Sequence, residues 1–93
     1  MSEIELKLSK IKPELMEKFQ VNKLGYFGSY SIGEQTSDSD LDLLVEFSKP
    51  VGWKFFTLEK YIENILGLKI DLVTSSALKK QYKDQILKQV KYI

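Results

Sequence analysis

Residues 40–47 have an apolar side chain at every second position, and three of the four positions between are acidic, a pattern typical of a β-strand. The segment reads Asp-Leu-Asp-Leu-Leu-Val-Glu-Phe. Successive side chains of a strand point to opposite faces, so residues two apart share a face. Four apolar residues can therefore face a core together: Leu41, Leu43, Val45 and Phe47. Asp40 and Asp42 then share the opposite face, and the pattern predicts a strand over residues 41–47 with two carboxylates at its start.

The two carboxylates are close enough to act on the same ions. Two strand rises of about 3.3 Å each separate Asp40 from Asp42, which allows the pair to hold one or two divalent cations. Mg²⁺ commonly binds one or two carboxylates together with substrate phosphates, rather than a full protein cage. A plainer alternative is a turn in which residues 37–40 cap local backbone groups. That alternative explains Asp38 and Asp40 but not Asp42, which lies between two leucines inside an apolar strand.

A Gly-Ser dipeptide precedes the acidic pair. Gly28 and Ser29 follow the short apolar run Leu24–Phe27, which predicts a strand that ends in a tight turn. Backbone N–H groups and a hydroxyl in such a turn can bind a phosphate, and glycine lets that backbone approach closely. The turn and the paired carboxylates together predict metal-assisted phosphoryl or nucleotidyl transfer. A structural role for Gly28 in the turn and for Ser29 as a helix N-cap is compatible, because a helix N-terminus also binds phosphate.

Asp71 is a third acidic candidate. It interrupts the apolar run of residues 70–73, where a hydrophobic side chain would be expected. An unpaired carboxylate at such a position costs free energy unless a cation or hydrogen-bond donors satisfy it. The structural alternatives are a lysine partner or a place at the end of an edge strand. If the strand with Asp71 lies beside the strand with Asp42, then Asp40, Asp42 and Asp71 form one acidic group.

Composition excludes several other kinds of site. The chain has no cysteine and no histidine, so it has no disulfide, no thiolate metal site and no histidine base. All fourteen basic residues are lysine. A triphosphate would therefore be neutralised by metal ions, backbone N–H groups and lysine, or by an arginine from another chain. The formal net charge of +1 does not favour direct binding of nucleic acid.

Length and hydropathy predict a single small domain. The 93 residues are expected to form one domain, residues 1–93, around one core. No segment reaches the ~18 apolar residues of a membrane span. Residues 1–10 lack the apolar core of a signal peptide, so we expect a cytoplasmic protein that does not bind membranes.

The N-terminal half predicts a helix before the first strand. Apolar residues at helical spacing cover residues 4–19, and Pro13 either kinks that helix or opens a second one. After the Gly-Ser turn, a single helical turn is expected around residues 30–33. Gly33 should have a positive φ or a close backbone neighbour.

The C-terminal half predicts a helix, a strand and a helix. Residues 53–66 should form a helix that stops near Gly67, and residues 69–73 should form the third strand. The first of these helices has a broad apolar face: Trp53, Phe56, Ile62, Ile65 and Leu66. The last helix, with N-cap choices at residues 74–76, has another: Leu78, Tyr82, Ile86, Val90 and Ile93. The element order indicates an α/β fold with a small sheet.

Two further clusters have a functional and a structural interpretation. Trp53, Phe55 and Phe56 could stack on a base, but aromatic side chains at helical spacing favour a place in the core. Four lysines could contact a phosphate or a partner, although a solvated face explains each of them taken singly: Lys49, Lys54, Lys79 and Lys80.

The spacing of these motifs resembles a known signature. Gly-Ser, ten residues and then Asp-x-Asp is the pattern of the DNA polymerase beta-like nucleotidyltransferase superfamily, and here it is Gly28-Ser29 followed by Asp40-Leu41-Asp42. The chain is most similar to the smallest branch, the minimal nucleotidyltransferase (MNT) family. The similarity covers most of the chain, including residues 23–27, 51–56, 69–74 and the helical tail.

The resemblance implies a fold, a site and a partner. The fold would be α/β, with a small mixed sheet flanked by helices. Gly28, Ser29 and Ser39 would bind ATP as substrate, and three aspartates would hold Mg²⁺, two ions in all: Asp40, Asp42 and Asp71. Asp71 would also act as general base on the attacking hydroxyl. The partner would be a HEPN-domain toxin, adenylylated on a tyrosine and thereby silenced by this chain as its type VII antitoxin.

One local difference from the family affects the phosphate site. Relatives commonly have an arginine between Ser29 and Gly33, where this chain has Tyr30 and Ile32.

Three functions are compatible with these observations. The first is transfer of AMP from ATP to a protein hydroxyl, because the chain has no room for a domain that holds the acceptor. The second is a catalytically weak or inactive antitoxin that masks its partner sterically, which the missing arginines favour. Three mutually repelling carboxylates without a cation would destabilise the fold, which favours the enzyme. The third is a small-molecule nucleotidyltransferase, which would need an acceptor pocket formed by dimerisation.

Overall fold

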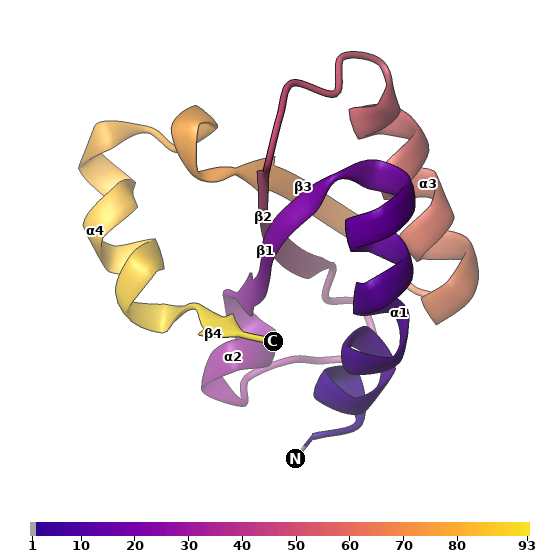
Figure 1. The fold of residues 1–93 in the computed structure, drawn as a ribbon. Helices are drawn as coiled ribbons and strands as arrows, with labels where there is room; N and C mark the ends of the chain where they lie inside the picture. The colour runs from indigo at the N-terminus through magenta and orange to yellow at the C-terminus, as the bar shows by residue number, and fades with distance from the viewer. Residues whose placement is uncertain (1) are drawn as a thin grey trace.

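A four-stranded mixed sheet organises the chain, which the computed structural model describes from residue 2 to residue 93 (Figure 1). The strands lie in the order β3-β2-β1-β4. Their bounds are Val21–Phe27 for β1, Leu41–Phe47 for β2, Ile70–Thr74 for β3 and Lys91–Tyr92 for β4. Strand β2 is parallel to β3 and antiparallel to β1, and β1 is antiparallel to β4. The predicted α/β class with a small mixed sheet is confirmed.

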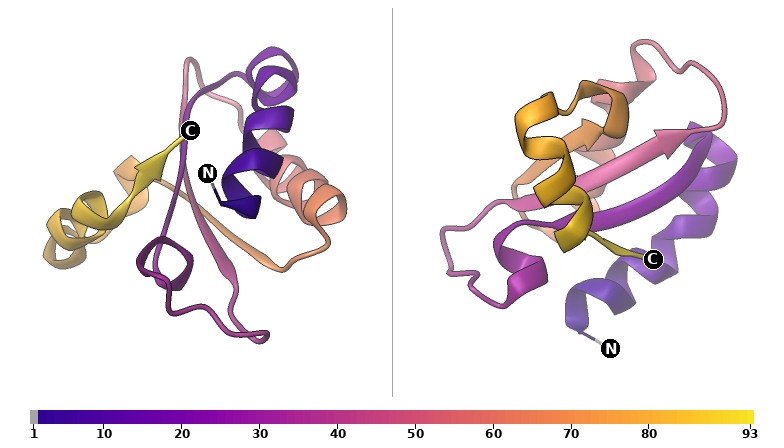
Figure 2. Two further views of the ribbon diagram at one scale, coloured as in Figure 1. Left: turned by 90° about the horizontal axis from the view of Figure 1, so that it is seen from below. Right: turned by 90° about the vertical axis from the view of Figure 1, so that its left-hand side faces the viewer.

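Helices lie on both sides of this sheet. Their bounds are Glu3–Phe19 for α1, Ser29–Ile32 for α2, Lys54–Leu66 for α3 and Lys80–Gln89 for α4, with a 3₁₀ turn, η1, at Ser75–Ala77. Helices α1 and α3 cover one face of the sheet, and α4 lies on the opposite side (Figure 2). Within residues 2–93, no helix is long and apolar enough to cross a membrane.

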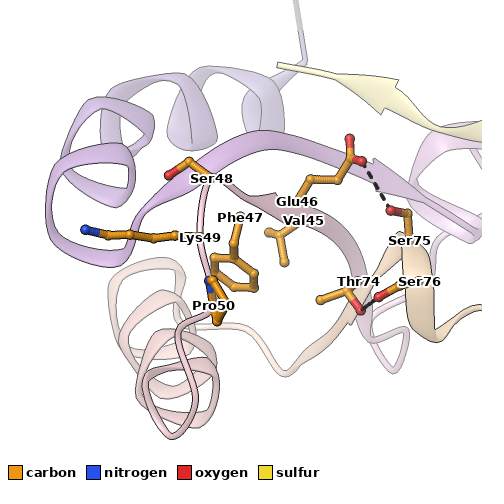
Figure 3. A pocket seen from close by; sticks show the side chains of 9 residues that line it. All are labelled: Val45, Glu46, Phe47, Ser48, Lys49, Pro50, Thr74, Ser75 and Ser76. Atoms are coloured by element: carbon orange, nitrogen blue, oxygen red, sulfur yellow. Dashed lines mark hydrogen bonds between the residues drawn. The ribbon is translucent and has the colours of Figure 1, made fainter.

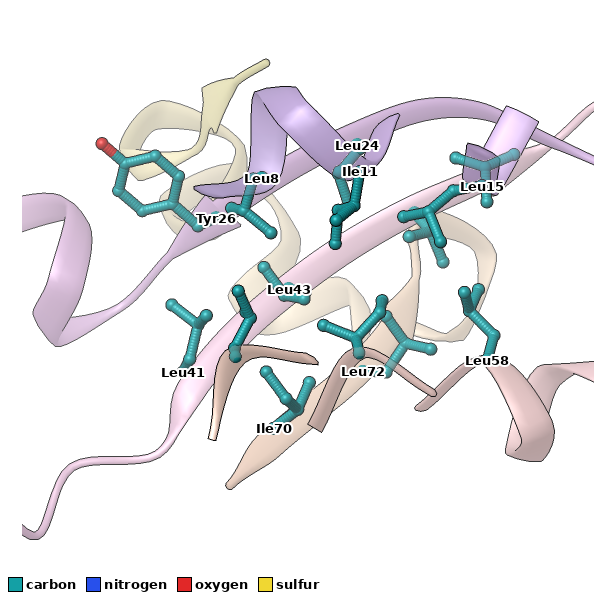
Figure 4. Packing of buried hydrophobic residues seen from close by; sticks show 14 of the residues in the cluster. Leu8, Ile11, Leu15, Leu24, Tyr26, Leu41, Leu43, Leu58, Ile70 and Leu72 are labelled. Carbon is teal, nitrogen blue, oxygen red and sulfur yellow. The ribbon is translucent and has the colours of Figure 1, made fainter. Parts of the chain in front are cut away.

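The hydrophobic core fills the space between the sheet and helices α1 and α3 (Figure 4). Helix α1 contributes residues at helical spacing: Leu8, Ile11, Leu15 and Phe19. Helix α3 contributes a straight stripe of side chains four residues apart: Leu58, Ile62 and Leu66. From β2 come three of the four predicted residues, Leu41, Leu43 and Val45, while Phe47 is only partly buried. The alternation of β2 therefore positions its core face as predicted.

Helix α1 continues through Pro13, so the alternative of two separate helices is wrong. Its first turn is capped by Ser2, whose hydroxyl accepts the backbone N–H of Glu5 at 3.2 Å. It ends at Gln20, which has a left-handed conformation with φ of 61°. Proline removes one helical N–H donor. Two core residues before Pro13 and two after it keep the helix packed against the sheet where this hydrogen bond is missing.

The prediction for the C-terminus was wrong. Instead of one helix from residues 74–76 to Ile93, the chain forms η1, then α4, and ends in strand β4. The N–H of Ile93 donates to the carbonyl of Leu24 at 2.8 Å, and Lys12 Nζ donates to the carbonyl of Ile93. These contacts with β1 and α1 thus hold the last residues in an extended conformation. A spacing of four between Val90 and its predecessors is compatible with a helix but does not require one.

The predicted apolar face of α3 was only partly right. Ile62 and Leu66 are buried, but Trp53 is 85% exposed, and Phe56 and Ile65 are exposed as well. The helix starts at Lys54 and places Leu58 toward the sheet, which turns the aromatic flank outward. A core role for Trp53 and Phe56 is therefore contradicted.

Candidate active site

Strand register brings the predicted site residues to one end of the sheet. In the antiparallel pair, Phe27 at the end of β1 lies opposite Asp42 near the start of β2. In the parallel pair, Asp42 lies opposite Asp71 of β3. Because neighbouring core residues such as Leu43 point to α1 and α3, Asp42 and Asp71 point to the other face. The condition set by the sequence, that the two acidic strands lie side by side, is fulfilled.

The surroundings of Asp42 disfavour the ionised form of its carboxyl group. Burial raises the pKa of its carboxyl group, and the negative charges of Asp71 and Asp40 raise it further. Asp40 directly precedes β2 and is exposed. Within residues 2–93 no lysine forms a salt bridge with any of these three aspartates. The result is a patch of negative charge that is not neutralised by the described part of the chain.

Asp71 lies beside Asp42, as expected, but not because a buried carboxylate needs a cation. Its side chain is exposed on an edge strand, so the predicted cost of burying a carboxylate does not arise. The structural alternative of an edge-strand position is thus fulfilled as well. A place on an edge strand explains why Asp71 is exposed, but it does not explain why Asp71 lies opposite Asp42.

Gly28 is fixed by two independent constraints. Its backbone has φ of 72° and ψ of −149°, a conformation that residues with a side chain rarely adopt. A Cβ atom at this position would lie 2.2 Å from Oδ2 of Asp42. Only glycine therefore lets the turn lie directly against the Asp42 carboxylate.

Helix α2 is the predicted helical turn after the Gly-Ser dipeptide. The carbonyl of Gly28 accepts the N–H groups of Ser31 and Ile32 at 3.0 and 3.3 Å, and also the Ser31 hydroxyl at 2.9 Å. The turn closes at Gly33, whose φ of 75° confirms the predicted positive value. Ser29 is its first residue, and the first N–H groups of a helix have no intrahelical acceptor. The turn thus presents donors beside the acidic group.

Ser39 has a local structural role in the loop between α2 and β2. Its hydroxyl accepts the N–H of Thr36 at 2.9 Å, and its own N–H donates to the Thr36 carbonyl at 3.1 Å. The residue directly precedes Asp40, so the closed turn holds the backbone that leads into the acidic pair. Its hydroxyl is therefore already engaged as an acceptor.

The donor set suits a hard divalent cation, although its ligands are not gathered into one cluster. Within residues 2–93, no three acidic side chains are arranged closely enough to hold a metal ion. Carboxylate oxygens are nevertheless the ligands that Mg²⁺ prefers, and the mutual repulsion at Asp42 is what a cation would relieve. Asp40 and Asp71 are exposed, so their side chains can turn toward Asp42 without repacking the core.

A cavity of about 470 Å³ lies at the other end of the same strands (Figure 3). It is lined by residues 45–50 and 74–76, which form the C-terminal ends of β2 and β3 and the segments that follow them. Its polar groups bond to each other: Ser75 Oγ donates to Glu46 at 3.3 Å, and the hydroxyls of Thr74 and Ser76 are 3.2 Å apart. The cavity is separate from the aspartates and does not form part of their site.

Two glutamates beside β3 were not recognised in the sequence. Glu63 Oε2 accepts the N–H of Ile70 at 3.0 Å, and Glu59 Oε2 accepts the N–H of Leu72 at 3.4 Å. The hydrogen bond from Ile70 is the main reason that the pKa of Glu63 is lowered. Their partners are backbone groups of a strand, so no side-chain motif could reveal them.

Comparison with known proteins places these features in context. A family model described as a nucleotidyltransferase domain matches residues 8–93. The protein adenylyltransferase MntA of Thermococcus cleftensis is 46% identical over 94 residues, covering 100% of this chain and 95% of MntA. A solved structure assigned as a minimal nucleotidyltransferase has a TM-score of 0.78 and 27% identity, with 97% of this chain and 95% of that chain covered. A crystal structure of a toxin–antitoxin pair with AMP-PNP has a TM-score of 0.76 and 26% identity, with 95% of this chain and 70% of that chain covered.

Proposed function

The chain belongs to the nucleotidyltransferase domain family, and on that premise we propose that it transfers AMP from ATP to a hydroxyl group of a protein partner. The observation that carries the proposal is the register of β2 against β1 and β3. It brings Gly28 and Asp71 to the two sides of Asp42, at one end of the sheet. A turn with backbone N–H donors and a set of carboxylates are the parts that such a transfer needs.

The three aspartates share one proposed role, and Asp71 has a second. Asp40, Asp42 and Asp71 would hold Mg²⁺, two ions in the full site, and the metal would supply positive charge to the attacking and leaving oxygens. The turn at Gly28 and Ser29 binds the triphosphate through backbone N–H groups, with Ser39 holding the loop beside it. The acceptor oxygen attacks the α-phosphorus, its proton passes to the Asp71 carboxylate, and pyrophosphate leaves. Exposure of Asp71 gives the acceptor hydroxyl access to this base.

A protein acceptor suits a chain of this size. The 93 residues have one hydrophobic core, and larger enzymes of this superfamily use additional domains to hold an acceptor. A macromolecular acceptor contributes its own recognition surface. The similarity to a protein adenylyltransferase and to a toxin–antitoxin pair supports a toxin protein as the partner. A HEPN toxin as that partner, and a tyrosine hydroxyl as the acceptor, are what the family resemblance implies. A cytoplasmic location is part of this proposal, since the proposed reaction consumes ATP.

The second candidate is a binding module that masks the toxin. The composition favours it, because the chain contains no arginine and Tyr30 and Ile32 stand where relatives commonly have one. Under this hypothesis the aspartates no longer catalyse transfer, and inhibition requires only a stoichiometric complex with the toxin. A small-molecule acceptor has less support, because the 470 Å³ cavity lies at the opposite end of the strands from Asp42.

Intact-mass spectrometry of the partner separates the two candidates. The cognate HEPN protein is incubated with ATP and Mg²⁺ and with either wild-type protein or the Asp40→Ala/Asp42→Ala variant. The enzyme reading predicts one or more added adenylyl groups with the wild type only. If the partner stays unmodified but is inhibited equally by both proteins, the enzyme reading is refuted and the masking module stands.

A further inference from the structure

Strand β3 lies at an edge of the sheet, yet its outer side is not open. Ile70 and Leu72 direct their N–H groups away from β2 and toward α3. Glu63 accepts the first of these at 3.0 Å, and Glu59 accepts the second at 3.4 Å. An edge strand normally exposes such groups to water or to another strand. Here two carboxylates of one helix occupy them.

Asp71 lies between the two bonded residues. Alternate residues of a strand direct their backbone groups to opposite sides, so Asp71 directs its own toward β2. The inner side is held by the parallel pairing of Asp71 with Asp42 and by the bond from the Leu41 N–H to the Lys69 carbonyl, at 2.9 Å. Asp71 is thus paired with β2 within the sheet, while its two chain neighbours are hydrogen-bonded to α3 on the outer side.

Helix α3 is a rigid support for this contact. Glu59 and Glu63 lie one turn apart, and each directly follows a core residue, Leu58 or Ile62, that is fully buried. The side chains of the two glutamates therefore have a fixed origin relative to the core. Hydrogen bonds to an ionised acceptor are stronger than those between neutral groups.

We propose that Glu59 and Glu63 are positioning residues that hold β3 so that Asp71 stays opposite Asp42. The proposal rests on the proposed function, because it gives Asp71 a catalytic position to keep. Without the glutamates, β3 is five residues of edge strand with backbone hydrogen bonds on one side only, and core packing of Ile70 and Leu72 has to hold its outer side. A small displacement of β3 moves the Asp71 carboxylate relative to the acceptor hydroxyl, and misplacement of a catalytic group lowers the rate without preventing nucleotide binding.

Substitutions at Glu63 separate positioning from simple stability. Glu63→Ala removes the acceptor and keeps a good helix former, so α3 should persist. Glu63→Gln keeps an oxygen that can accept the Ile70 N–H but has no charge. Glu17→Ala, at an exposed position of α1, is the control for loss of a helical glutamate. Asp71→Asn gives the reference phenotype of a lost base.

Two measurements are made on the full chain: amide hydrogen exchange of Ile70 by NMR, and the steady-state kinetics of AMP transfer to the partner with Mg²⁺ and ATP. For Glu63→Ala we expect exchange at Ile70 to accelerate about tenfold or more, since a bond to a charged acceptor is lost. We expect kcat to fall by about tenfold while KM for ATP changes less than about twofold. Asp71→Asn should show the same pattern, a lower kcat with little change in KM for ATP. Glu63→Gln should restore most of both, and Glu17→Ala should change neither.

The outcomes are distinguishable. Faster exchange at Ile70 in Glu63→Ala with an unchanged kcat would show a contact that serves stability alone, and would overturn the positioning role. Unchanged exchange at Ile70 would overturn the contact itself. Absence of transfer by the wild-type protein would instead refute the proposed function, and the exchange rates at Ile70 would then decide by themselves whether Glu63 holds β3.

Discussion

At the scale of single residues, Gly28 links the shape of the turn to the acidic group. Its φ and ψ values exclude most other residues, and the space that a Cβ would need is occupied by the Asp42 carboxylate. Gly33 shares a positive φ, but nothing lies within 4 Å of a Cβ added there. Gly28 and Gly33 flank the same short helix, α2, but a methyl group would contact the Asp42 carboxylate only at Gly28.

Substitution of these glycines should have unequal effects. Gly33→Ala adopts a left-handed conformation at a cost of about 1–2 kcal/mol in the free energy of unfolding. Gly28→Ala adds strain in a region reserved for glycine and pushes Asp42 aside, so it should abolish Mg²⁺–ATP binding and AMP transfer. Thermal melts and isothermal titration with Mg²⁺–ATP measure both effects. Equal losses of nucleotide binding in the two variants would contradict the contact with Asp42.

Asp42 should also make stability depend on pH. Its pKa in the folded state is raised above the unfolded value, so the folded chain takes up this proton first as the pH falls. The ionised carboxylate therefore opposes folding at pH 7, and the penalty diminishes as the pH falls through the folded-state pKa toward the unfolded value of about 3.9. Without divalent cations, Asp42→Asn should be more stable than wild type at pH 7, by a margin that narrows toward pH 4.

Urea unfolding at the two pH values tests this expectation. Asp38→Asn, in the exposed loop before Asp40, is the control for loss of one negative charge. The electrostatic account of Asp42 fails if Asp42→Asn is the less stable protein at pH 7 in the absence of cations.

At the scale of elements, the contact between β1 and the C-terminal residues depends on Gly25. A Cβ there would lie 2.8 Å from Val90 Cγ2 and 3.1 Å from the Lys91 carbonyl oxygen. Gly25→Ala should therefore push β4 away from β1 and destabilise the protein by about 1–3 kcal/mol, as overpacking does. In a Val90→Ala background the same change should be less damaging, because the closest contact is gone.

A double-mutant cycle measures this coupling. Unfolding free energies of wild type, the two single variants and the double variant should depart from additivity, since the two side chains are in contact. Additive effects would mean that Val90 does not pack on Gly25 and that β4 is held by other contacts.

Sequence patterns predicted the elements that are determined locally. Strand β2 has the predicted bounds because its alternation is set by its own residues, and α3 ends at Gly67, whose φ of 66° allows the left-handed turn. Strand β4 was missed because it is two residues long and depends on β1, more than sixty residues earlier. Exposure of Trp53 was missed because helical periodicity does not say which of two adjoining flanks faces the sheet.

The candidate site was predictable to the same extent. Asp40, Asp42 and Gly28 follow from motifs, whereas the partnership of Asp71 with Asp42 depended on strand order, which the sequence left as a condition. The contacts of Glu59 and Glu63 with β3 join side chains to backbone groups thirteen and seven residues away. Such contacts have no signature in residue types.

At the scale of the whole molecule, the two faces of the sheet are unequal. Helices α1 and α3 cover one face and form the hydrophobic core with it, while α4, on the other side, contributes no buried residue. Asp42 and Asp71 belong to this less covered face. The core stabilises the fold from one side and leaves the acidic group on the other, as the proposed transfer to a large acceptor requires.

This asymmetry predicts that cations stabilise the protein as a whole. A ligand that binds only the folded state raises the free energy of unfolding by mass action, by about 2.7 kcal/mol at a hundred times its dissociation constant. Mg²⁺ or Mn²⁺, with ATP, should therefore raise the melting temperature of wild type by relieving the repulsion among Asp40, Asp42 and Asp71. Asp42→Asn should show no such gain, although it starts from a more stable cation-free state. Differential scanning fluorimetry with Mg²⁺ alone, ATP alone and both together separates the contributions, with Asp38→Asn as the control that keeps the full response. A wild-type melt that is insensitive to Mg²⁺ and Mn²⁺, with and without ATP, would rule out a metal site at these aspartates.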